Sequence, residues 1–303
     1  MAIGTEALTT ETLGQFNVAI GRSALQSQNN TTATDVYNVA VGYNAGTSVT
    51  TGNQNTFLGS LAGTSLTDAD SNVAVGMSSL EADTLGSSST ALGFRTLKNQ
   101  NFTTDTNSFN VAVGHQAGLS ITSGIENTIV GARAGDALTD ADFNVVVGQG
   151  ALSADTLGSK SVAIGAGTLN VQNFTTATDT FNTAVGHVAG GSITTGTRNT
   201  FLGGLSGDAT TTGDKNVSVG TSALSANTVG SRSVAVGDSA LAAQNPATAT
   251  EMYNTAVGHG AGAAVTTGIF NVLIGGLSGD AITDADFNVC LLYTSPSPRD
   301  GLL

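Results

Sequence analysis

The chain has 303 residues, of which 40% are hydrophobic, 10% are charged, 40 are Gly and 3 are Pro. This composition excludes collagen, which needs Gly at every third position and abundant Pro, and it is too rich in aliphatic residues for a disordered chain. The net charge of −13 disfavours nucleic acid and anionic membrane surfaces as partners, since both are polyanions.

One short motif recurs from the first residues onward: a polar residue, often Asn, is followed by three mostly apolar residues and then by Gly. Residues 17–21, for example, read Asn-Val-Ala-Ile-Gly. The final glycines, which we call anchor glycines, are spaced in the cycle 17, 17, 17, 21, so every fourth anchor glycine occupies an equivalent position. They are Gly4, Gly21, Gly42, Gly59, Gly76, Gly93, Gly114, Gly131, Gly148, Gly165, Gly186, Gly203, Gly220, Gly237, Gly258 and Gly275.

We call the units with a spacing of 17 short coils and those with a spacing of 21 long coils. A short coil has too few residues for a helical hairpin, and the Val-Ala-Val alternation has the period of a strand. A β-branched run closed by Gly and followed by Gly, Ser, Thr and Asn predicts a short strand and then turns. The sequence therefore predicts an all-β solenoid, built from short and long coils in a super-repeat of 72. Stacked at ~4.8 Å per coil, such coils predict a rod of about 80 Å.

The two sides of each predicted strand are both apolar. The residue before the anchor glycine, such as Val113, is aliphatic in every copy, so we expect this column to form the interior and Val113→Asp to unfold the local coils. The preceding residue points the other way and is mostly Ala. It is large or branched in every fourth coil, at Phe57, Ile129, Phe201 and Leu273. A strand apolar on both faces is covered on both, which predicts a homo-oligomer. The alternative is inward packing within one thicker coil.

Two further columns are polar or glycine-rich. Asn recurs four residues before the anchor glycine, where stacked amides can hydrogen-bond from coil to coil. Glycines four or ten residues after the anchors, such as Gly46, Gly52, Gly118 and Gly124, are expected in turns with positive φ.

The long coils insert four extra residues, which predicts a protruding loop in each. The insertions begin at Gln28, Gln100, Gln172 and Gln244. Loops on a rigid scaffold often carry recognition, and we expect the Phe side chains to be exposed unless a neighbouring chain covers them. The candidate receptor-contact or interface residues are Asn30, Asn101, Phe102, Asn173, Phe174 and Asn245.

Two sets of residues invite a metal or catalytic interpretation. His115, His187 and His259 occupy equivalent positions of successive super-repeats, but no carboxylate accompanies them at a fixed close spacing, which favours surface or interface packing over a metal site. The tripeptides 68–70, 140–142 and 284–286 read Asp-Ala-Asp. Turn capping by Asp is favoured there over Ca²⁺ binding or glycoside hydrolysis. With no catalytic motif present, we expect no enzyme activity and no cofactor or metal.

The repeats resemble the head repeats of YadA-like trimeric autotransporter adhesins, and more closely the same repeats in bacteriophage tail fibres. Asn72–Gly76 with Leu80, and residues 254–258 (Asn-Thr-Ala-Val-Gly), carry this resemblance, which covers residues 1–289. It implies a left-handed parallel β-roll assembled as a homotrimer in an elongated attachment organelle.

The resemblance predicts a phage tail fibre segment in the virion, whose partners are its own copies and a host cell-surface glycan or protein. The alternative is an adhesin head on a bacterial surface that binds host matrix. A third hypothesis, an ice-binding solenoid, arises from Thr-rich coils, although the Thr pairs 50–51 and 194–195 occur only once per super-repeat. No membrane insertion is expected of this segment, because no apolar run approaches ~18 residues.

The two ends of the chain interrupt the pattern. The sequence opens inside a coil without a capping unit, so we expect a truncated fragment. After Val289, the string 290–303 departs from the repeat and resembles translated sequencing adapter, as in an assembled environmental read. We therefore expect residues 1–289 to form the repeat domain and residues 290–303 to lie outside the fold, so that the single Cys290 says nothing about redox compartment.

Overall fold

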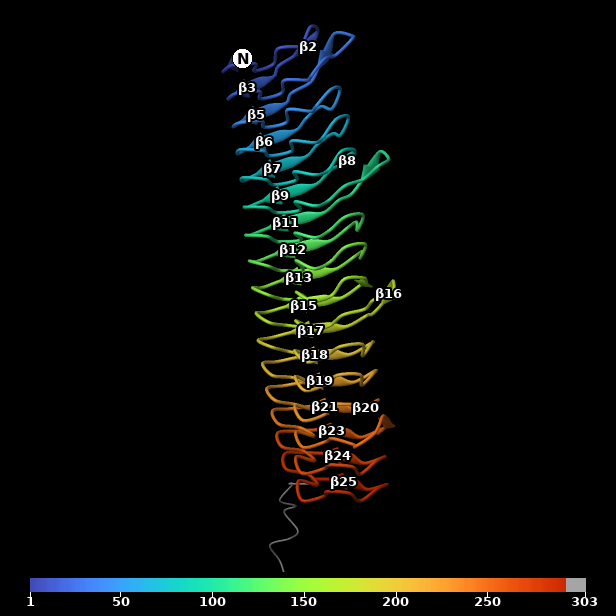
Figure 1. The fold of residues 1–303 in the computed structure, drawn as a ribbon. Coiled ribbons are helices and arrows are strands. Elements are labelled where there is room, and N and C mark those ends of the chain that lie inside the picture. Colours follow the sequence, from blue (N-terminus) through green and yellow to red (C-terminus); the bar gives the residue numbers. More distant parts are fainter. Residues whose placement is uncertain (293–303) are drawn as a thin grey trace, which may run out of the picture. The chain divides into compact units, whose positions relative to one another are not determined.

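The computed structural model describes residues 1–292, in which strands and turns alternate and no α-helix forms (Figure 1). The predicted class, an all-β parallel solenoid, is confirmed, with about 17 turns. The chain is described below as two compact units, Met1–Asn182 (unit 1) and the part that begins at Thr183 (unit 2). Each coil of a solenoid packs on its immediate neighbours, so contacts between distant coils are few.

In unit 1, each coil contributes one short strand to a parallel sheet, and successive strands pair in chain order. The register keeps equivalent residues side by side, as with Ala112 between Ala91 and Ile129. These main strands are β1 (Ala2–Ile3), β3 (Val18–Ile20), β5 (Val39–Val41), β6 (Thr56–Leu58), β7 (Val73–Val75), β9 (Thr90–Leu92), β11 (Val111–Val113), β12 (Thr128–Val130), β13 (Val145–Val147) and β15 (Val162–Ile164).

The predicted protrusions of unit 1 are small two-stranded parallel pairs at the long coils. They are β2 (Gly14–Gln15) with β4 (Thr34–Asp35), β8 (Gly86–Ser87) with β10 (Thr106–Asn107), and β14 (Gly158–Ser159) with β16 (Thr178–Asp179). The insertion does not begin at the glutamine as expected. Gln100 and Gln172 are fully buried, and the exposed part of each loop follows a few residues later, at 103–105 and 175–177.

Unit 2 repeats the same plan. Its main strands are β17 (Thr183–Val185), β18 (Thr200–Leu202), β19 (Val217–Val219), β21 (Val234–Val236), β23 (Thr255–Val257), β24 (Val272–Ile274) and β25 (Val289–Leu291), and its protrusion pairs β20 (Gly230–Ser231) with β22 (Thr250–Glu251).

The end of the repeat differs from the expectation. Cys290 pairs with Leu273 and Leu291 with Ile274, because Cys and Leu are apolar residues, as the repeat requires at these two strand positions. The predicted boundary after Val289 therefore falls inside a strand, and the remaining adapter-like residues, 293–303, lie outside the described residues.

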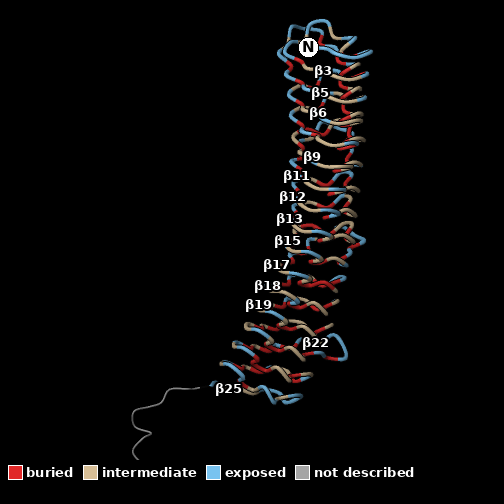
Figure 2. The backbone as a smooth tube through the Cα atoms, turned by 90° about the vertical axis from the view of Figure 1, so that its left-hand side faces the viewer, coloured by how far each residue is buried: buried red, intermediate tan, exposed pale blue. Residues whose placement is uncertain are grey.

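The sidedness predicted for the main strands is wrong. The middle residue of the main strands from β3 to β24 points inward: Ala19, Ala40, Phe57 and Ala112 are all 0% exposed. The residue before the anchor glycine points outward, as in Leu58 and Leu92, which are 47% and 43% exposed. Figure 2 shows buried residues recurring at the same positions of the successive coils. The inner column is mostly Ala because the interior of the coil is narrow. Of the two apolar columns on each strand, the one with the smaller side chains therefore points into the interior.

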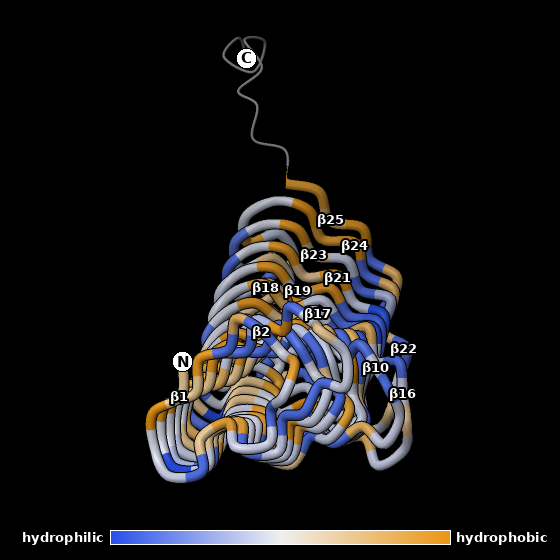
Figure 3. Tube along the Cα trace, turned by 90° about the horizontal axis from the view of Figure 1, so that it is seen from above, coloured by the Kyte–Doolittle hydropathy of each residue, from blue (hydrophilic) through white to orange (hydrophobic). Residues whose placement is uncertain are grey.

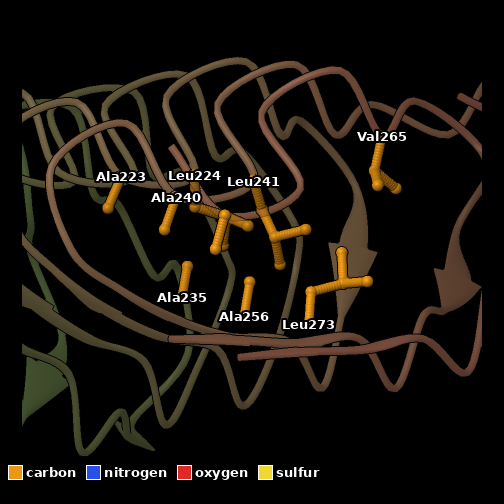
Figure 4. Close-up of a cluster of buried hydrophobic side chains, with 9 residues drawn as sticks. Ala223, Leu224, Ala235, Ala240, Leu241, Ala256, Val265 and Leu273 are labelled. Carbon is orange, nitrogen blue, oxygen red and sulfur yellow. The ribbon is translucent and has the colours of Figure 1, made fainter. Parts of the chain in front are cut away.

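Large inner residues are accommodated by glycines at the facing corner. A Cβ at Gly46 would lie 2.6 Å from Cδ2 of Phe57, and one at Gly63 would also collide with the ring. Some coils with Ala in the inner column carry Leu at the same corner, as at Leu80 and Leu97, which are fully buried. In unit 2, Figure 4 shows the equivalent arrangement, with Leu224 and Leu241 directed toward the strands that bear Ala235, Ala256 and Leu273.

The glycines have two separate roles. Gly114 has a φ of +137°, and a Cβ there would lie 2.5 Å from the carbonyl oxygen of Gly131, so the anchor column must be free of side chains. Gly46 and Gly118 have positive φ, as predicted. Gly52 and Gly124 do not; a Cβ at either would instead strike the backbone of the next coil.

The predicted asparagine ladder is present, but its bonds run mainly from side chain to backbone. Oδ1 of Asn110 accepts from the backbone N–H of Asn127 at 2.9 Å, and Nδ2 of Asn127 donates to the carbonyl of Ala141 at 2.8 Å. Direct amide–amide contacts, such as Asn144 Nδ2 to Asn127 Oδ1 at 3.2 Å, are fewer. Each fully buried Asn thus satisfies backbone groups of a neighbouring coil and of a turn.

Candidate functional site

The outward side of the main strands carries no charged residue in the described chain. We call the first and third residues of the three-residue main strands the outer strand face; it consists of Val, Ile, Leu and Thr. Many of these side chains are exposed, including Val39 (36%), Val111 (37%) and Leu202 (36%). Figure 3 shows hydrophobic residues along β23, β24 and β25 of unit 2. An uncharged surface with many exposed apolar side chains is typical of an interaction site.

A second exposed column precedes the buried asparagines, and sequence reasoning missed it. We call it the corner column; its residues have φ near +57°, and many are aromatic. The sequence did contain a signal for this column, because an aromatic residue repeatedly stands directly before Asn. In unit 1 the column is Phe16, Tyr37, Gln54, Ser71, Ser88, Phe109, Glu126, Phe143, Lys160 and Phe181; in unit 2 it is Arg198, Lys215, Arg232, Tyr253, Phe270 and Phe287.

Rings stack on one another where successive coils both carry an aromatic residue in the corner column. The centroids of Phe16 and Tyr37 are 5.3 Å apart, those of Tyr253 and Phe270 are 5.0 Å apart, and those of Phe270 and Phe287 are 5.1 Å apart. Where a basic residue precedes an aromatic one, it lies over the ring, as Lys160 does over Phe181. The column therefore offers aromatic and cationic groups beside the outer strand face.

A buried polar network lies beneath each protrusion. In the network of Asp155, Oδ1 accepts from the N–H groups of Gly158 (3.1 Å) and Phe174 (3.0 Å), and Oδ2 accepts from Nε2 of Gln172 (2.6 Å). Nδ2 of Asn182 donates to Oε1 of Gln172 at 2.8 Å. Burial raises the pKa of Asp155 above its ordinary value of 3.8, although these hydrogen bonds oppose the shift. No basic group contacts the carboxylate in the described residues, so the network holds the loop by hydrogen bonds alone.

The equivalent positions of other coils differ in chemistry. Burial alone would raise the pKa of Glu11, but hydrogen bonds from Gly14, Gln28 and Asn30 outweigh it and set the pKa at about 2. In unit 2 the position is occupied by Asn227, whose Oδ1 accepts from the Gly230 N–H at 3.1 Å. An amide therefore performs the same structural task as the carboxylates.

The structure divides the six loop candidates into two groups. Phe102 and Phe174 are only 7% exposed and Asn30 is 5% exposed, so the expected exposure of the Phe rings is wrong. Phe102 packs against Gly86 of its own chain. The other three, Asn101, Asn173 and Asn245, are exposed. Their Oδ1 atoms accept from Thr hydroxyls of the preceding coil at 3.0, 3.2 and 2.7 Å.

The acidic turns cap backbone groups, as predicted. Oδ1 of Asp70 accepts from the N–H of Asn53 at 2.8 Å, and Asp142 accepts from Ile125 in the same way. Asp214, where the tripeptide pattern breaks, retains the bond, to Thr197 at 2.6 Å. The capping bond therefore depends on the last residue of the tripeptide and not on the pair of carboxylates.

The three histidines do not converge with other ligands. The His115 ring stacks on Phe94 at 5.3 Å, and His259 Nε2 lies 3.5 Å from Asp238. Within residues 1–292, no three His, Cys, Asp or Glu side chains are placed to hold one metal ion.

Threonine forms a longer ladder than the sequence pairs suggested. Thr50, Thr67 and Thr122 each donate their hydroxyl to the backbone carbonyl of the equivalent residue one coil on. Three of every four coils carry Thr at this position, and the fourth carries Asn. The hydroxyls are thus used within the coils, in a single column, whereas the ice-binding hypothesis requires a flat array.

Comparison with known proteins adds no assignment. No family model matches the sequence, and no curated protein matches it significantly. In the part of the chain that the structure describes, no helix is long and apolar enough to span a membrane.

Proposed function

We propose that this chain is a non-enzymatic structural and adhesive segment of a fibre, assembled as a homotrimer in a phage tail fibre. The observation that carries the proposal is the outer strand face, which lacks charge in a chain whose net charge is −13. A solvated face would carry polar side chains alternating with the buried ones. The trimeric state and the phage setting derive from the resemblance to YadA-like repeats.

The partner that fits this face is a second copy of the chain. The outer strand face repeats once per coil, so identical coils of another copy offer apolar residues at the same spacing. Obligate homo-oligomers typically have interfaces with an apolar core from which charged residues are absent. In such an assembly the outer strand face would be covered, and the protrusions would remain available for weak, repeated contacts with a cell surface.

Thiol cross-linking tests this assembly. Leu92, on the outer strand face, is replaced by Cys in a Cys290→Ala background and treated with a short bifunctional thiol reagent. We expect cross-linked species of up to three chains. The matched control, Thr104→Cys on an exposed loop, should give far less product. Equal products from both positions would contradict the interface, and a series that stops at two chains would contradict the trimer.

Gene context tests the phage setting. In the complete reading frame and its surroundings, capsid and baseplate genes are the expected neighbours. A signal peptide and a membrane anchor in the same reading frame would overturn the phage assignment in favour of a bacterial adhesin head.

A further inference from the structure

The corner column of unit 2 begins with three basic residues on successive coils. Arg198, Lys215 and Arg232 occupy equivalent positions of these coils, and Arg198 and Lys215 are exposed. Parallel strands are separated by ~4.8 Å, so these cations follow one another along the coils at about that spacing. No other position of the repeat in residues 1–292 carries basic residues on two successive coils, and none carries acidic residues on two.

Two of these cations form no ion pair within the described residues, although the charge of Lys215 acts on the nearby carboxylate of Glu251. Nε of Arg232 donates to Oε1 of Glu251 at 2.8 Å, but within the described residues neither Arg198 nor Lys215 has a carboxylate within ion-pair distance. Accumulated unpaired positive charge in a strongly acidic chain indicates a negatively charged partner.

A surface cavity lies beside these cations. It has a volume of about 140 Å³ and is lined by Asp214, Lys215, Ser231, Arg232, Ala249, Thr250 and Glu251. Both carboxylates of its wall already accept protein hydrogen bonds: Asp214 from Thr197 at 2.6 Å, and Glu251 from Arg232 and from the Tyr253 hydroxyl, each at 2.8 Å. The ammonium of Lys215 makes no hydrogen bond within the described residues, and of the Arg232 guanidinium only Nε is engaged, so the cavity suits an acceptor-rich group.

Aromatic rings continue the column beyond the cations. Arg232 lies 5.5 Å from the centroid of the Tyr253 ring, and Tyr253, Phe270 and Phe287 form one stack. Tyr253 and Phe270 are 39% and 43% exposed. A sugar ring with a carboxylate substituent needs two kinds of contact. The aromatic side chains can pack against its C–H groups, and the neighbouring cations can pair with its carboxylate.

We propose that this part of the corner column binds an anionic polysaccharide, which lies along the coils with its carboxylates on Arg198, Lys215 and Arg232 and its sugar rings beside Tyr253 and Phe270. A second copy of the chain fits less well, because no column of acidic residues exists to meet three successive cations. Nucleic acid also fits less well, since three cations release few counterions against a net charge of −13.

Affinity electrophoresis of the full chain through gels containing polygalacturonate tests the proposal, with dextran gels as the neutral reference. We expect retardation only by polygalacturonate, and at least a ten-fold loss of affinity in Arg198→Ala/Lys215→Ala. Lys215→Arg should bind within three-fold of the wild type. The control Arg22→Ala/Arg133→Ala removes the same charge from exposed sites elsewhere and should bind as the wild type does.

Three results would overturn the proposal: no retardation by polygalacturonate, equal losses in the two double variants, or equally tight binding of single-stranded DNA. The polysaccharide site rests on the proposed attachment function but needs only the coils of unit 2. Repeating the measurement with Val113→Asp, in which we expect separated chains, distinguishes a failure of this site from a failure of the proposed homotrimer. Binding by separated chains supports this site whatever the oligomeric state, and loss of binding on separation would show that one chain does not contain it.

Discussion

The inner and outer sides of the main strands are both apolar, but they differ in side-chain size. The inner column of unit 1 is mostly Ala, with Phe57, Ile129 and Val146 as larger members, and all of these are fully buried. The outer strand face has branched residues in nearly every coil, and they remain partly exposed. The inner side is limited by the volume of its own coil. The outer side is not limited by its own chain, and we propose that a second copy covers its large residues.

The largest expected effect comes from a charge on the inner side. Ala112→Asp should destabilise the fold by about 5 kcal/mol, because an unpaired carboxylate would be buried between the strands that carry Ala91 and Ile129. Chemical denaturation followed by circular dichroism measures the loss. A variant as stable as the wild type would show that Ala112 does not face the interior.

Removing the largest inner side chain should have the next effect. Phe57→Ala leaves a cavity between Gly46 and Gly63, so the expected cost is about 3–5 kcal/mol. Phe57→Leu is the matched control and should lose much less, since Leu273 occupies the equivalent position in unit 2. If the two variants had equal stability, the ring would not fill the space that these glycines leave.

The asparagine ladder should contribute less per residue. Asn127→Ala leaves the backbone N–H of Asn144 and the carbonyl of Ala141 without their side-chain partners, and we expect a loss of about 2 kcal/mol. Hydrogen exchange of the Asn144 amide should accelerate in this variant. Unchanged exchange at Asn144 would argue against the side-chain-to-backbone ladder.

The sequence predicted the fold to a large extent but not the sidedness. Anchor spacing determined the strand positions and the coil length, since such short coils leave room for few alternatives. Hydrophobic alternation could not tell Ala112 from Val113, because it detects polarity and both residues are apolar. The size of the inner residue was the better signal, together with Gly46 and Gly63 beside Phe57. Phe102 was misplaced because its burial depends on Gly86 in the preceding coil, which local pattern does not show.

The polar networks beneath the protrusions contain two carboxyl groups at equivalent positions with opposite pKa shifts. The pKa of Glu11 is lowered to about 2, so its contribution to stability is present above pH 4.5 and is lost as pH falls from 4.5 toward 2. The pKa of Asp155 is raised, so the folded state binds the proton more tightly, and the contribution of Asp155 decreases as pH rises above 3.8 through the raised pKa.

Two variants test the opposite pKa shifts of Glu11 and Asp155. Glu11→Gln should lower the free energy of unfolding at pH 7 and make that free energy less sensitive to acid. Asp155→Asn should be at least as stable as the wild type at pH 7, because Asn227 already serves this position in unit 2. Denaturation at pH 7 and at pH 3 provides the comparison. Equal pH dependence in the two variants would show that the two networks do not differ in this way.

The smallest effect on the stability of a single chain, and the largest on assembly, is expected from the outer side. Val113 lies next to Ala112 but is only half-buried, so Val113→Asp should cost about 1 kcal/mol or less in the separated chain, in contrast to the unfolding that the sequence alone predicted.

Sedimentation velocity and equilibrium measure the assembly directly. The wild type should sediment as three times the chain mass of 30.0 kDa, Val113→Asp as a folded single chain, and the exposed-loop control Thr104→Asp as the wild type. A wild-type chain that sediments as a stable folded monomer would contradict the claim that the outer strand face is covered by copies of itself.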